Sequence, residues 1–301
     1  MSRVLVTGGG GFIGRHVVDG LLARGHEVHV ASRSDSAARP PNWHRVDLLN
    51  AGDTEALIAA SRPEILVHLA WYTNPLDYRS SLENLHWSEA SIRLIRLFGA
   101  YGGRRFIGAG TCAEYDARHG LCSESTTPSD PQTLYGACKN AVREVASHAA
   151  NHLGIEAAWA RVFFPYGPGE PRDKLVSYIA TQLLQGRPAD TTTGGQFRDY
   201  IHVTDIASAF VALVESSKTG IFNVGTGIPV SVAHIAQTMG RLLEAPDLIR
   251  LGARASRDET PLLIADIRKS RSELNWQPTI SLEEGLEKTI EALGSMHGKW
   301  S

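Results

Sequence analysis

The segment Val4-Leu5-Val6-Thr7-Gly8-Gly9-Gly10-Gly11-Phe12-Ile13-Gly14 decides the fold class of this chain. It joins a short apolar run, a glycine-rich turn and the start of an amphipathic helix without a break. Glycine is needed where a turn takes a positive φ, where backbone approaches a pyrophosphate and where a helix packs closely on a strand. The free N–H groups at a helix N-terminus then favour phosphate. The segment therefore predicts the nucleotide-binding turn of a βαβ unit.

The rest of the first half alternates strands and helices, as a parallel sheet with helices on both faces requires. Apolar runs predict strands at 4–7, 27–31, 65–70, 105–109 and 156–162, and helical periodicity lies over 81–98 and 135–152. We therefore expect an α/β fold with a doubly wound parallel sheet of the Rossmann type.

The Pro/Gly-rich segment 165–171 interrupts this alternation, because proline removes backbone donors and discourages a continuing helix or strand. We expect a dinucleotide-binding domain over 1–165 and a smaller C-terminal α/β lobe for the substrate over 166–301, with 198–217 packing back onto the first domain. In the second lobe we expect helices at 174–185, 203–215, 232–243 and 282–293 and strands at 200–202 and 221–224.

Composition excludes several classes of protein. The 301 residues are 43% hydrophobic and 21% charged, which is typical of a globular chain with a large core. A formal net charge of -2 offers no general attraction for nucleic acid or an anionic membrane, so an anionic ligand must meet a local positive site. The three cysteines lack metal spacing. Neither a signal-peptide layout nor a run of about 20 apolar residues is present, so we expect a cytoplasmic protein.

Tyr135 and Lys139 stand four residues apart in a predicted helix, so both side chains project from one face. The chain has only six lysines, which makes a lysine at this spacing notable. A phenol with a pKa of about 10 is a poor base at neutral pH, and a neighbouring ammonium lowers that pKa. We expect the pair to donate and accept a proton for a carbonyl/alcohol couple.

The spacing Thr7-Gly8-x-x-Gly11-x-x-Gly14, followed by Tyr135-x-x-x-Lys139, resembles the extended short-chain dehydrogenase/reductases, the NAD(P)-dependent epimerase/dehydratase family. The family has a catalytic Ser or Thr four residues before a Tyr, and Thr111 stands at that offset from Tyr115. The resemblance implies that the catalytic residues are Thr111, Tyr135 and Lys139. It implies cofactor contacts from Gly8, Gly11, Phe12, Ile13, Gly14, Ser32, Arg33, Asp47, Leu48, Leu69, Ala70, Trp71, Tyr135, Lys139, Val162 and Phe163.

The end of the second strand indicates which cofactor is preferred. A strict NAD binder places a carboxylate there to hold the ribose 2′-hydroxyl, whereas this chain has Ser32-Arg33. A hydroxyl and a guanidinium can hold a 2′-phosphate, so we expect NADP(H), with NAD(H) as the alternative. In that alternative, Arg33 is a solvated loop residue and Asp35 holds the ribose.

Segment 194–205, Gly-Gly-Gln-Phe-Arg-Asp-Tyr-Ile-His-Val-Thr-Asp, resembles a block of the family enzymes that act on nucleotide-linked sugars. Similar blocks at 222–227, 265–270 and 274–278 extend the resemblance over nearly the whole chain. In the family the arginine, here Arg198, pairs with the nucleotide diphosphate, which a guanidinium fork suits. The substrate-binding residues implied are Thr73, Asn74, Thr111, Glu114, Phe164 and Arg198.

Departures from the family pattern narrow the expected reaction. Cys112-Ala113 replaces the Asp-Glu pair of 4,6-dehydratases, so dehydration is not expected, and we interpret Cys112 as a small buried apolar residue. Phe164 replaces an Asn that contacts substrate phosphates in many epimerases. Segment 255–258 replaces the usual Arg-Pro-Gly-Asp, so Arg254 or Arg257 would serve instead.

We therefore expect NADPH-dependent reduction of the C4 ketone of a nucleotide-activated (dTDP, GDP or CDP) 4-keto-6-deoxyhexose, as in deoxysugar biosynthesis, with Tyr135 as the proton donor. An epimerase keeps NAD bound and a reductase consumes NADPH, so Ser32-Arg33 favours reduction. An NAD-dependent nucleotide-sugar 4-epimerase is the alternative, and a non-catalytic NADP(H)-binding redox sensor a remote one. We expect a homodimer formed through helices 81–98 and 135–152, and no metal, nucleic-acid or membrane partner.

Overall fold

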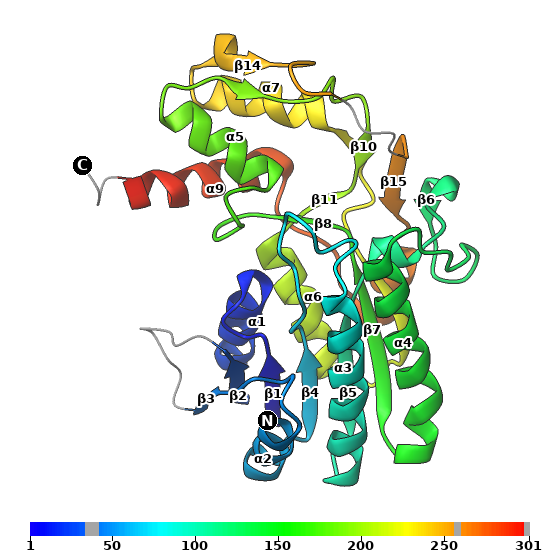
Figure 1. Ribbon diagram of the computed structural model, residues 1–301. Coiled ribbons are helices and arrows are strands. Elements are labelled where there is room, and N and C mark those ends of the chain that lie inside the picture. The colour runs from blue at the N-terminus through cyan, green and yellow to red at the C-terminus, as the bar shows by residue number, and fades with distance from the viewer. Residues whose placement is uncertain (34–41, 256–259, 298–301) are drawn as a thin grey trace.

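A seven-stranded parallel sheet forms the centre of the computed structural model, which describes residues 1–33, 42–255 and 260–297 (Figure 1). Its strand order is β12-β7-β5-β4-β1-β2-β3, with every neighbouring pair parallel. The doubly wound fold expected from the sequence is confirmed. The strands are β1 (Arg3–Thr7), β2 (Glu27–Ser32), β3 (Asn42–Arg45), β4 (Ile65–His68), β5 (Arg105–Thr111), β7 (Glu156–Val162) and β12 (Gly220–Val224).

Helices cover both faces of this sheet because alternate residues of each buried strand point to opposite sides. In β1, Val4 and Val6 pack under α1 (Phe12–Ala23) and α6 (Val203–Glu215), whereas Leu5 points to the other core. On that second face lie α2 (Ala51–Ser61), α3 (Glu83–Ala100) and α4 (Leu134–Leu153). In sheets of this kind a ligand binds outside the carboxyl ends of the strands.

Three further helices share a separate apolar core and gather above the large sheet (Figure 1). They are α5 (Leu175–Leu184), α7 (Val232–Leu242) and α9 (Leu282–His297). Short strands surround them: β8 (Phe164–Tyr166) pairs with β11 (Tyr200–His202), and β9 (Ala189–Asp190) pairs with β14 (Ile249–Arg250). A four-stranded sheet runs β13 (Val230–Ser231), β10 (Phe197–Arg198), β15 (Leu262–Ala265) and β6 (Leu121–Cys122).

Two elements of segment 166–301 belong to the core of the large sheet. Helix α6 packs against α1, and β12 forms an edge of the sheet beside β7. The short helix α8 (Arg268–Leu274) follows β15 and packs on β12. Strand β3 was not expected, and the strand expected over 65–70 ends at His68, where Leu69 N–H bonds to the Thr7 carbonyl. Within the described residues, no helix is long and apolar enough to cross a membrane.

Candidate cofactor and substrate site

The glycine loop between β1 and α1 has the shape of a cradle for an anion. Gly8 has φ 70°, and a Cβ added there would lie 2.8 Å from the backbone nitrogen of Ala70. A Cβ added to Gly14 would lie 2.1 Å from the Gly8 carbonyl oxygen. Gly11 is the N-cap of α1 and has no side chain to accept a hydrogen bond. The backbone N–H groups of Phe12 and Ile13, at the start of the helix, are therefore free to bind an anion at the loop. The residues present therefore fit a dinucleotide pyrophosphate.

Ser32 and Arg33 lie at the carboxyl end of β2, next to this loop. The Ser32 hydroxyl would be 2.9 Å from a Cβ added to Gly10. The exposed Arg33 guanidinium lies 5.8 Å from the centroid of the buried Trp87 ring. Asp35, the alternative ribose ligand, is outside the described residues.

The turn at Asp47 and Leu48, which is expected to contact adenine, is held by Arg93, a helix residue that the sequence did not single out. In this turn Asp47 is exposed and accepts from Leu49 N–H at 3.1 Å, and Leu48 is buried. Arg93 of α3 donates from Nη2 to the Leu48 carbonyl at 2.8 Å and the Leu49 carbonyl at 3.1 Å. A contact between a helix side chain and a distant backbone carbonyl leaves no local sequence pattern by which it could be recognised.

The other predicted cofactor residues lie at the carboxyl ends of β4 and β7, on either side of β5. Leu69 and Ala70 follow β4 beside Gly8, and Trp71 comes next, with its indole N–H donating to Asn84 Oδ1 at 2.8 Å. Val162 ends β7 and is buried, as is Phe163, whose N–H donates to the Val224 carbonyl.

Thr111, Tyr135 and Lys139 converge at the carboxyl end of β5. Tyr135 is partly buried, and its ring stands edge-on to that of Trp71, with centroids 6.4 Å apart. The Thr111 side chain hydrogen-bonds the phenol. Lys139 donates from Nζ to the Ala109 carbonyl at 2.8 Å and lies 3.9 Å from the Trp71 ring centroid. The structure thus brings together the three residues that were predicted to be catalytic.

The expectation that the pKa of Tyr135 is lowered is wrong. Burial raises the pKa of the Tyr135 phenol, although the hydrogen bond from Thr111 opposes the rise. The Lys139 ammonium is directed to the Ala109 carbonyl and the Trp71 ring instead. Burial lowers the pKa of Lys139 to about 7, and the charge of Glu114 opposes that fall.

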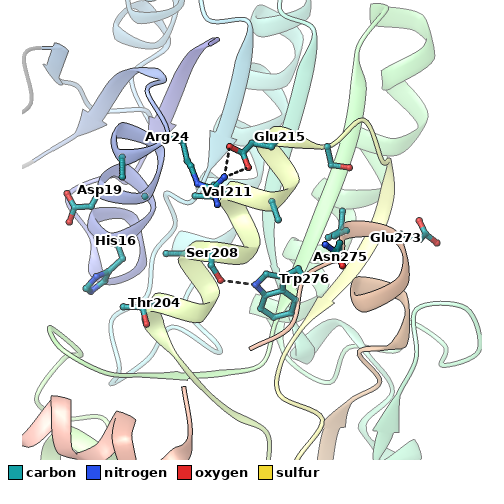
Figure 2. Close-up of a pocket in the computed structure, with 16 residues that line it drawn as sticks. His16, Asp19, Arg24, Thr204, Ser208, Val211, Glu215, Glu273, Asn275 and Trp276 are labelled. Carbon is teal, nitrogen blue, oxygen red and sulfur yellow. Dashed lines mark hydrogen bonds and ion pairs between the residues drawn. The ribbon is translucent and has the colours of Figure 1, made fainter. Parts of the chain in front are cut away.

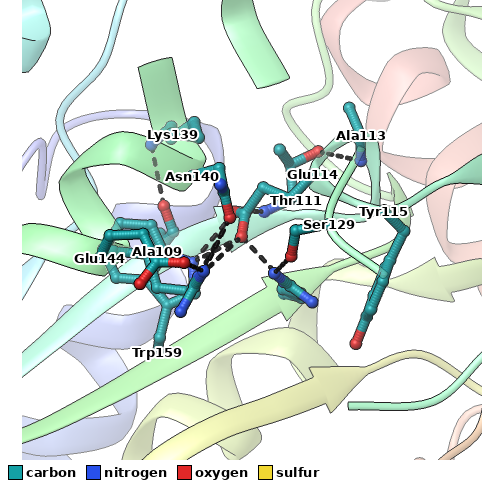
Figure 3. A network of polar contacts seen from close by, with 12 residues as sticks. Ala109, Thr111, Ala113, Glu114, Tyr115, Ser129, Lys139, Asn140, Glu144 and Trp159 are labelled. Carbon is teal, nitrogen blue, oxygen red and sulfur yellow. Dashed lines mark hydrogen bonds and ion pairs between the residues drawn. The ribbon is translucent and has the colours of Figure 1, made fainter. Parts of the chain in front are cut away.

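Glu114 does not face a substrate, which corrects a second expectation. Its side chain is completely buried and accepts from Trp159 Nε1 at 3.0 Å and Arg161 Nε at 2.8 Å (Figure 3). It also accepts from Thr111 N–H at 2.8 Å. Both carboxylate oxygens are therefore occupied. The sequence offered one hint of this burial. Glu114 directly precedes Tyr115, which is itself buried, in the turn that follows a predicted strand.

A cleft of about 700 Å³ separates the loop after β4 from the upper helices. Residues 75–80 line one side, and Lys174, residues 192–193 and 195–196, and Arg254 line the other. Lys174 Nζ lies 4.9 Å from the Tyr78 ring centroid, so the two sides meet there. Thr73 and Asn74, predicted to bind substrate, are exposed at the start of the same loop, and Asn74 donates to the Tyr72 hydroxyl at 3.2 Å.

Arg198, the predicted diphosphate ligand, lies among backbone carbonyls and is 7% exposed. Its Nη1 donates to the carbonyls of Phe197 at 2.9 Å and Thr260 at 2.8 Å, and its guanidinium lies 5.5 Å from the Phe164 ring centroid. Arg254 lines the cleft and lies 4.4 Å from the Tyr178 ring centroid. Arg257, the other arginine considered for this role, is outside the described residues.

Cys112 is buried, as expected for a small apolar residue, and burial raises its pKa to about 12. A thiol in this state is protonated at neutral pH and does not act as a base. Among the described residues, no group of three or more His, Cys, Asp or Glu side chains is arranged to hold a metal ion.

A second groove, of about 760 Å³, lies between α1 and α6 (Figure 2). Arg24 and Glu215 form an ion pair across it at 3.2 Å, and the Trp276 indole donates to Ser208 at 2.8 Å. None of the predicted site residues lines this groove. The cleft lined by Tyr78 is the one that adjoins the candidate catalytic residues, because the Tyr78 ring contacts the Tyr135 ring.

Comparison with known proteins agrees with this arrangement. Residues 4–225 match the family described as NAD dependent epimerase/dehydratase. UDP-glucose 4-epimerase from Mycolicibacterium smegmatis is 28% identical over 318 residues, which cover 96% of this chain and 97% of that protein. UDP-glucuronic acid decarboxylase 1 from Arabidopsis thaliana is 26% identical over 96% of this chain and 69% of its own length. The crystal structure of UDP-glucose 4-epimerase from Thermus thermophilus in complex with NAD superposes with a TM-score of 0.87 at 26% identity, covering 96% of this chain and 98% of that one.

Proposed function

The chain belongs to the NAD-dependent epimerase/dehydratase family, and on that premise we propose that it reduces the C4 ketone of a nucleotide-activated 4-keto-6-deoxyhexose with NADPH. It is an enzyme of the extended short-chain dehydrogenase/reductase type. The observation that carries the proposal is the meeting of Thr111, Tyr135 and Lys139 beside the glycine cradle.

Tyr135 can serve as the proton donor of the proposed reduction. Burial raises the pKa of the phenol, which favours the protonated form that a developing alkoxide needs. Thr111, hydrogen-bonded to the phenol, is placed to orient the same substrate oxygen. When bound, the nicotinamide supplies the hydride to C4.

Other residues hold the ligands in the proposed reaction. The N–H groups at the start of α1 receive the pyrophosphate of the cofactor, and Lys139 holds the nicotinamide ribose. Ser32 and Arg33 receive the 2′-phosphate. A hydroxyl and a guanidinium can bind that group, and this favours NADP(H) over NAD(H). Arg198 or Arg254 receives the diphosphate of a dTDP-, GDP- or CDP-linked sugar.

An NAD-dependent 4-epimerase is the second candidate, and the relatives favour it. Two of the similar proteins are UDP-glucose 4-epimerases, one of them in complex with NAD. An epimerase oxidises and reduces the same carbon, so it would retain NAD through purification and need no added reductant.

One experiment separates these candidates. The purified protein is analysed for bound cofactor and then incubated with NADPH and a panel of dTDP-, GDP- and CDP-linked 4-keto-6-deoxyhexoses. We expect NADPH oxidation with at least one of them, loss of most turnover in Tyr135→Phe, and unchanged turnover in Tyr101→Phe, whose hydroxyl donates to Glu55 away from the site. Tightly bound NAD and epimerisation without reductant would establish the second candidate. Absence of any turnover would leave the redox-sensor alternative.

We further propose a homodimer through α3 and α4, which pack against each other. Leu85 is 51% exposed, and Ile92 and Val145 are each 37% exposed, so these helices carry apolar side chains at the surface. Light scattering with Ile92→Glu and Val145→Glu variants tests this, because a charge in an apolar interface favours the monomer.

A further inference from the structure

Glu114 lies three residues after the candidate catalytic Thr111, is completely buried and does not line the cleft. It is on the single-turn helix η1 (Cys112–Glu114), which continues from β5. Its oxygens accept from the Thr111 and Arg161 N–H groups, each at 2.8 Å, and from the Trp159 indole at 3.0 Å. A carboxylate with no exposed surface is costly unless it is fully paired, and this one is paired on both oxygens.

We propose that Glu114 is a positioning residue of the reaction proposed above, which fixes the Thr111 hydroxyl and maintains a negative charge near Lys139 and Tyr135. The inference rests on the proposed function of this site. It assigns Glu114 a role that requires neither substrate contact nor exposure.

The first half of this role is geometric. Glu114 accepts from the backbone N–H of Thr111, while Thr111 Oγ1 accepts from Ala113 N–H at 3.2 Å. This reciprocal capping box fixes both the backbone and the side chain of Thr111. Because its oxygen already accepts one hydrogen bond, the hydroxyl is oriented to donate its proton elsewhere. Tyr135 is a group in the site whose pKa a hydrogen bond from the Thr111 side chain lowers.

The second part of the proposed role is electrostatic, and it depends on the charged and titratable groups that face Glu114, Lys139 and Tyr135. Glu114 is faced by Arg161 from β7 and by Arg143 from α4, whose Nε is 4.0 Å from a carboxylate oxygen. Lys139 is faced by His68 from β4, whose pKa burial lowers to about 3, so that ring is neutral. Tyr135 is faced by Tyr78 and by Cys112, and burial keeps the Cys112 thiol protonated. Glu114 is the carboxylate that acts on both Lys139 and Tyr135.

The sign of the expected change follows from these charges. The charge of Glu114 raises the pKa of Lys139 and also that of Tyr135. Removing it lowers both pKa values, because a nearby anion no longer favours the protonated forms. The Lys139 ammonium, and with it any hold on a nicotinamide ribose, is then lost at a lower pH.

The test compares Glu114→Gln, which removes the charge, with Trp159→Phe, which removes a neutral donor to the same carboxylate. NADPH fluorescence titrations from about pH 4.5 to 9 give the pH at which affinity falls for each protein. We expect this midpoint near pH 7 in the unmodified protein and about one unit lower in Glu114→Gln. Trp159→Phe should lose thermal stability but keep the midpoint.

An unmoved midpoint in Glu114→Gln, with only its melting temperature lowered, would show a purely structural residue and overturn the inference. If that variant does not fold, Glu114→Gln/Arg161→Gln removes both buried charges together and leaves a neutral pair, with a smaller shift in the same direction, because Glu114 is the group that acts on Lys139. Failure of the unmodified protein to bind NADPH or NADH would count against the proposed function itself. Binding with an unmoved midpoint counts against Glu114 alone.

Discussion

The ring of Tyr78 stands edge-on to the ring of Tyr135, with 5.1 Å between centroids and 82° between planes. Lys174, from the start of α5, reaches the same Tyr78 ring from the other side of the cleft. The backbone reinforces this contact, because Tyr135 N–H donates to the Arg79 carbonyl at 3.1 Å. Tyr78 therefore joins the candidate proton donor to the lobe that would bind the substrate.

Replacing Tyr78 should weaken substrate binding more than cofactor binding. In Tyr78→Ala the cleft loses an aromatic wall and Lys174 loses its cation–π partner, together worth about 1–2 kcal/mol, or roughly tenfold in affinity. Calorimetric titration with the preferred nucleotide sugar and with NADPH measures both effects. Tyr78→Phe keeps the ring and serves as the control. Equal losses for both ligands would mean that Tyr78 acts on the whole fold.

Arg33 should determine which dinucleotide is preferred. Arg33→Ala is expected to weaken NADP(H) binding by about tenfold or more, because a charge-assisted hydrogen bond to the 2′-phosphate is lost. NAD(H) binding should change little. Fluorescence titrations with NADPH and NADH test this, with Arg104→Ala, an exposed arginine paired with Glu64, as control. A parallel loss for both cofactors would contradict a 2′-phosphate role.

The parts of the site that follow from sequence are those whose geometry is local. A helix places residues four apart on one face, so Tyr135 and Lys139 could be paired from spacing alone. The glycine cradle could also be predicted, because positive φ and close backbone approach exclude other residues. Glu114 could not be placed, since its burial depends on Trp159 and Arg161 from a distant strand.

The ionisation of the site was also beyond local reasoning. Spacing indicated a cation near Tyr135 but not that burial outweighs it, because desolvation depends on the whole surrounding packing. For the same reason Arg198 was recognised as a ligand candidate, whereas its bonds to the Phe197 and Thr260 carbonyls became visible only in three dimensions.

Gly14 should tolerate no side chain. Gly14→Ala places a methyl group against the Gly8 carbonyl, and the loop must shift to relieve the contact. We expect loss of most dinucleotide affinity together with a lower melting temperature. Gly294→Ala is the matched control: this helical glycine has open space around it, and the change should add about 0.5–1 kcal/mol of stability. Normal NADPH binding by Gly14→Ala would rule out the cradle as the pyrophosphate site.

Asp199 should matter for stability rather than for chemistry, although it follows Arg198 in the block that resembles sugar-nucleotide enzymes. It is completely buried and accepts from Thr226 N–H and hydroxyl at 2.6 and 2.7 Å, Gly227 N–H at 2.9 Å and Ala265 N–H at 3.0 Å. Asp199→Asn would turn an amide N–H₂ toward these donors, at a cost of about 2–4 kcal/mol in urea unfolding. A stable variant without turnover would instead place Asp199 in the reaction.

Lys139 should destabilise the fold at low pH. A residue kept for its function can carry such a cost, whereas a residue kept for the fold should stabilise it. Its pKa is lowered on folding from 10.5 to about 7, so between these values the unfolded chain binds more protons and stability rises with pH. Lys139→Met keeps the length of the side chain without the charge. It should be more stable than the unmodified protein by on the order of 5 kcal/mol at pH 6, with most of the gain lost by pH 10, while losing turnover. Urea unfolding at both pH values measures this difference. A variant that is less stable at pH 6 would mean that the ammonium is held for the fold, because its contacts with Ala109 and Trp71 would then outweigh the cost of burying its charge.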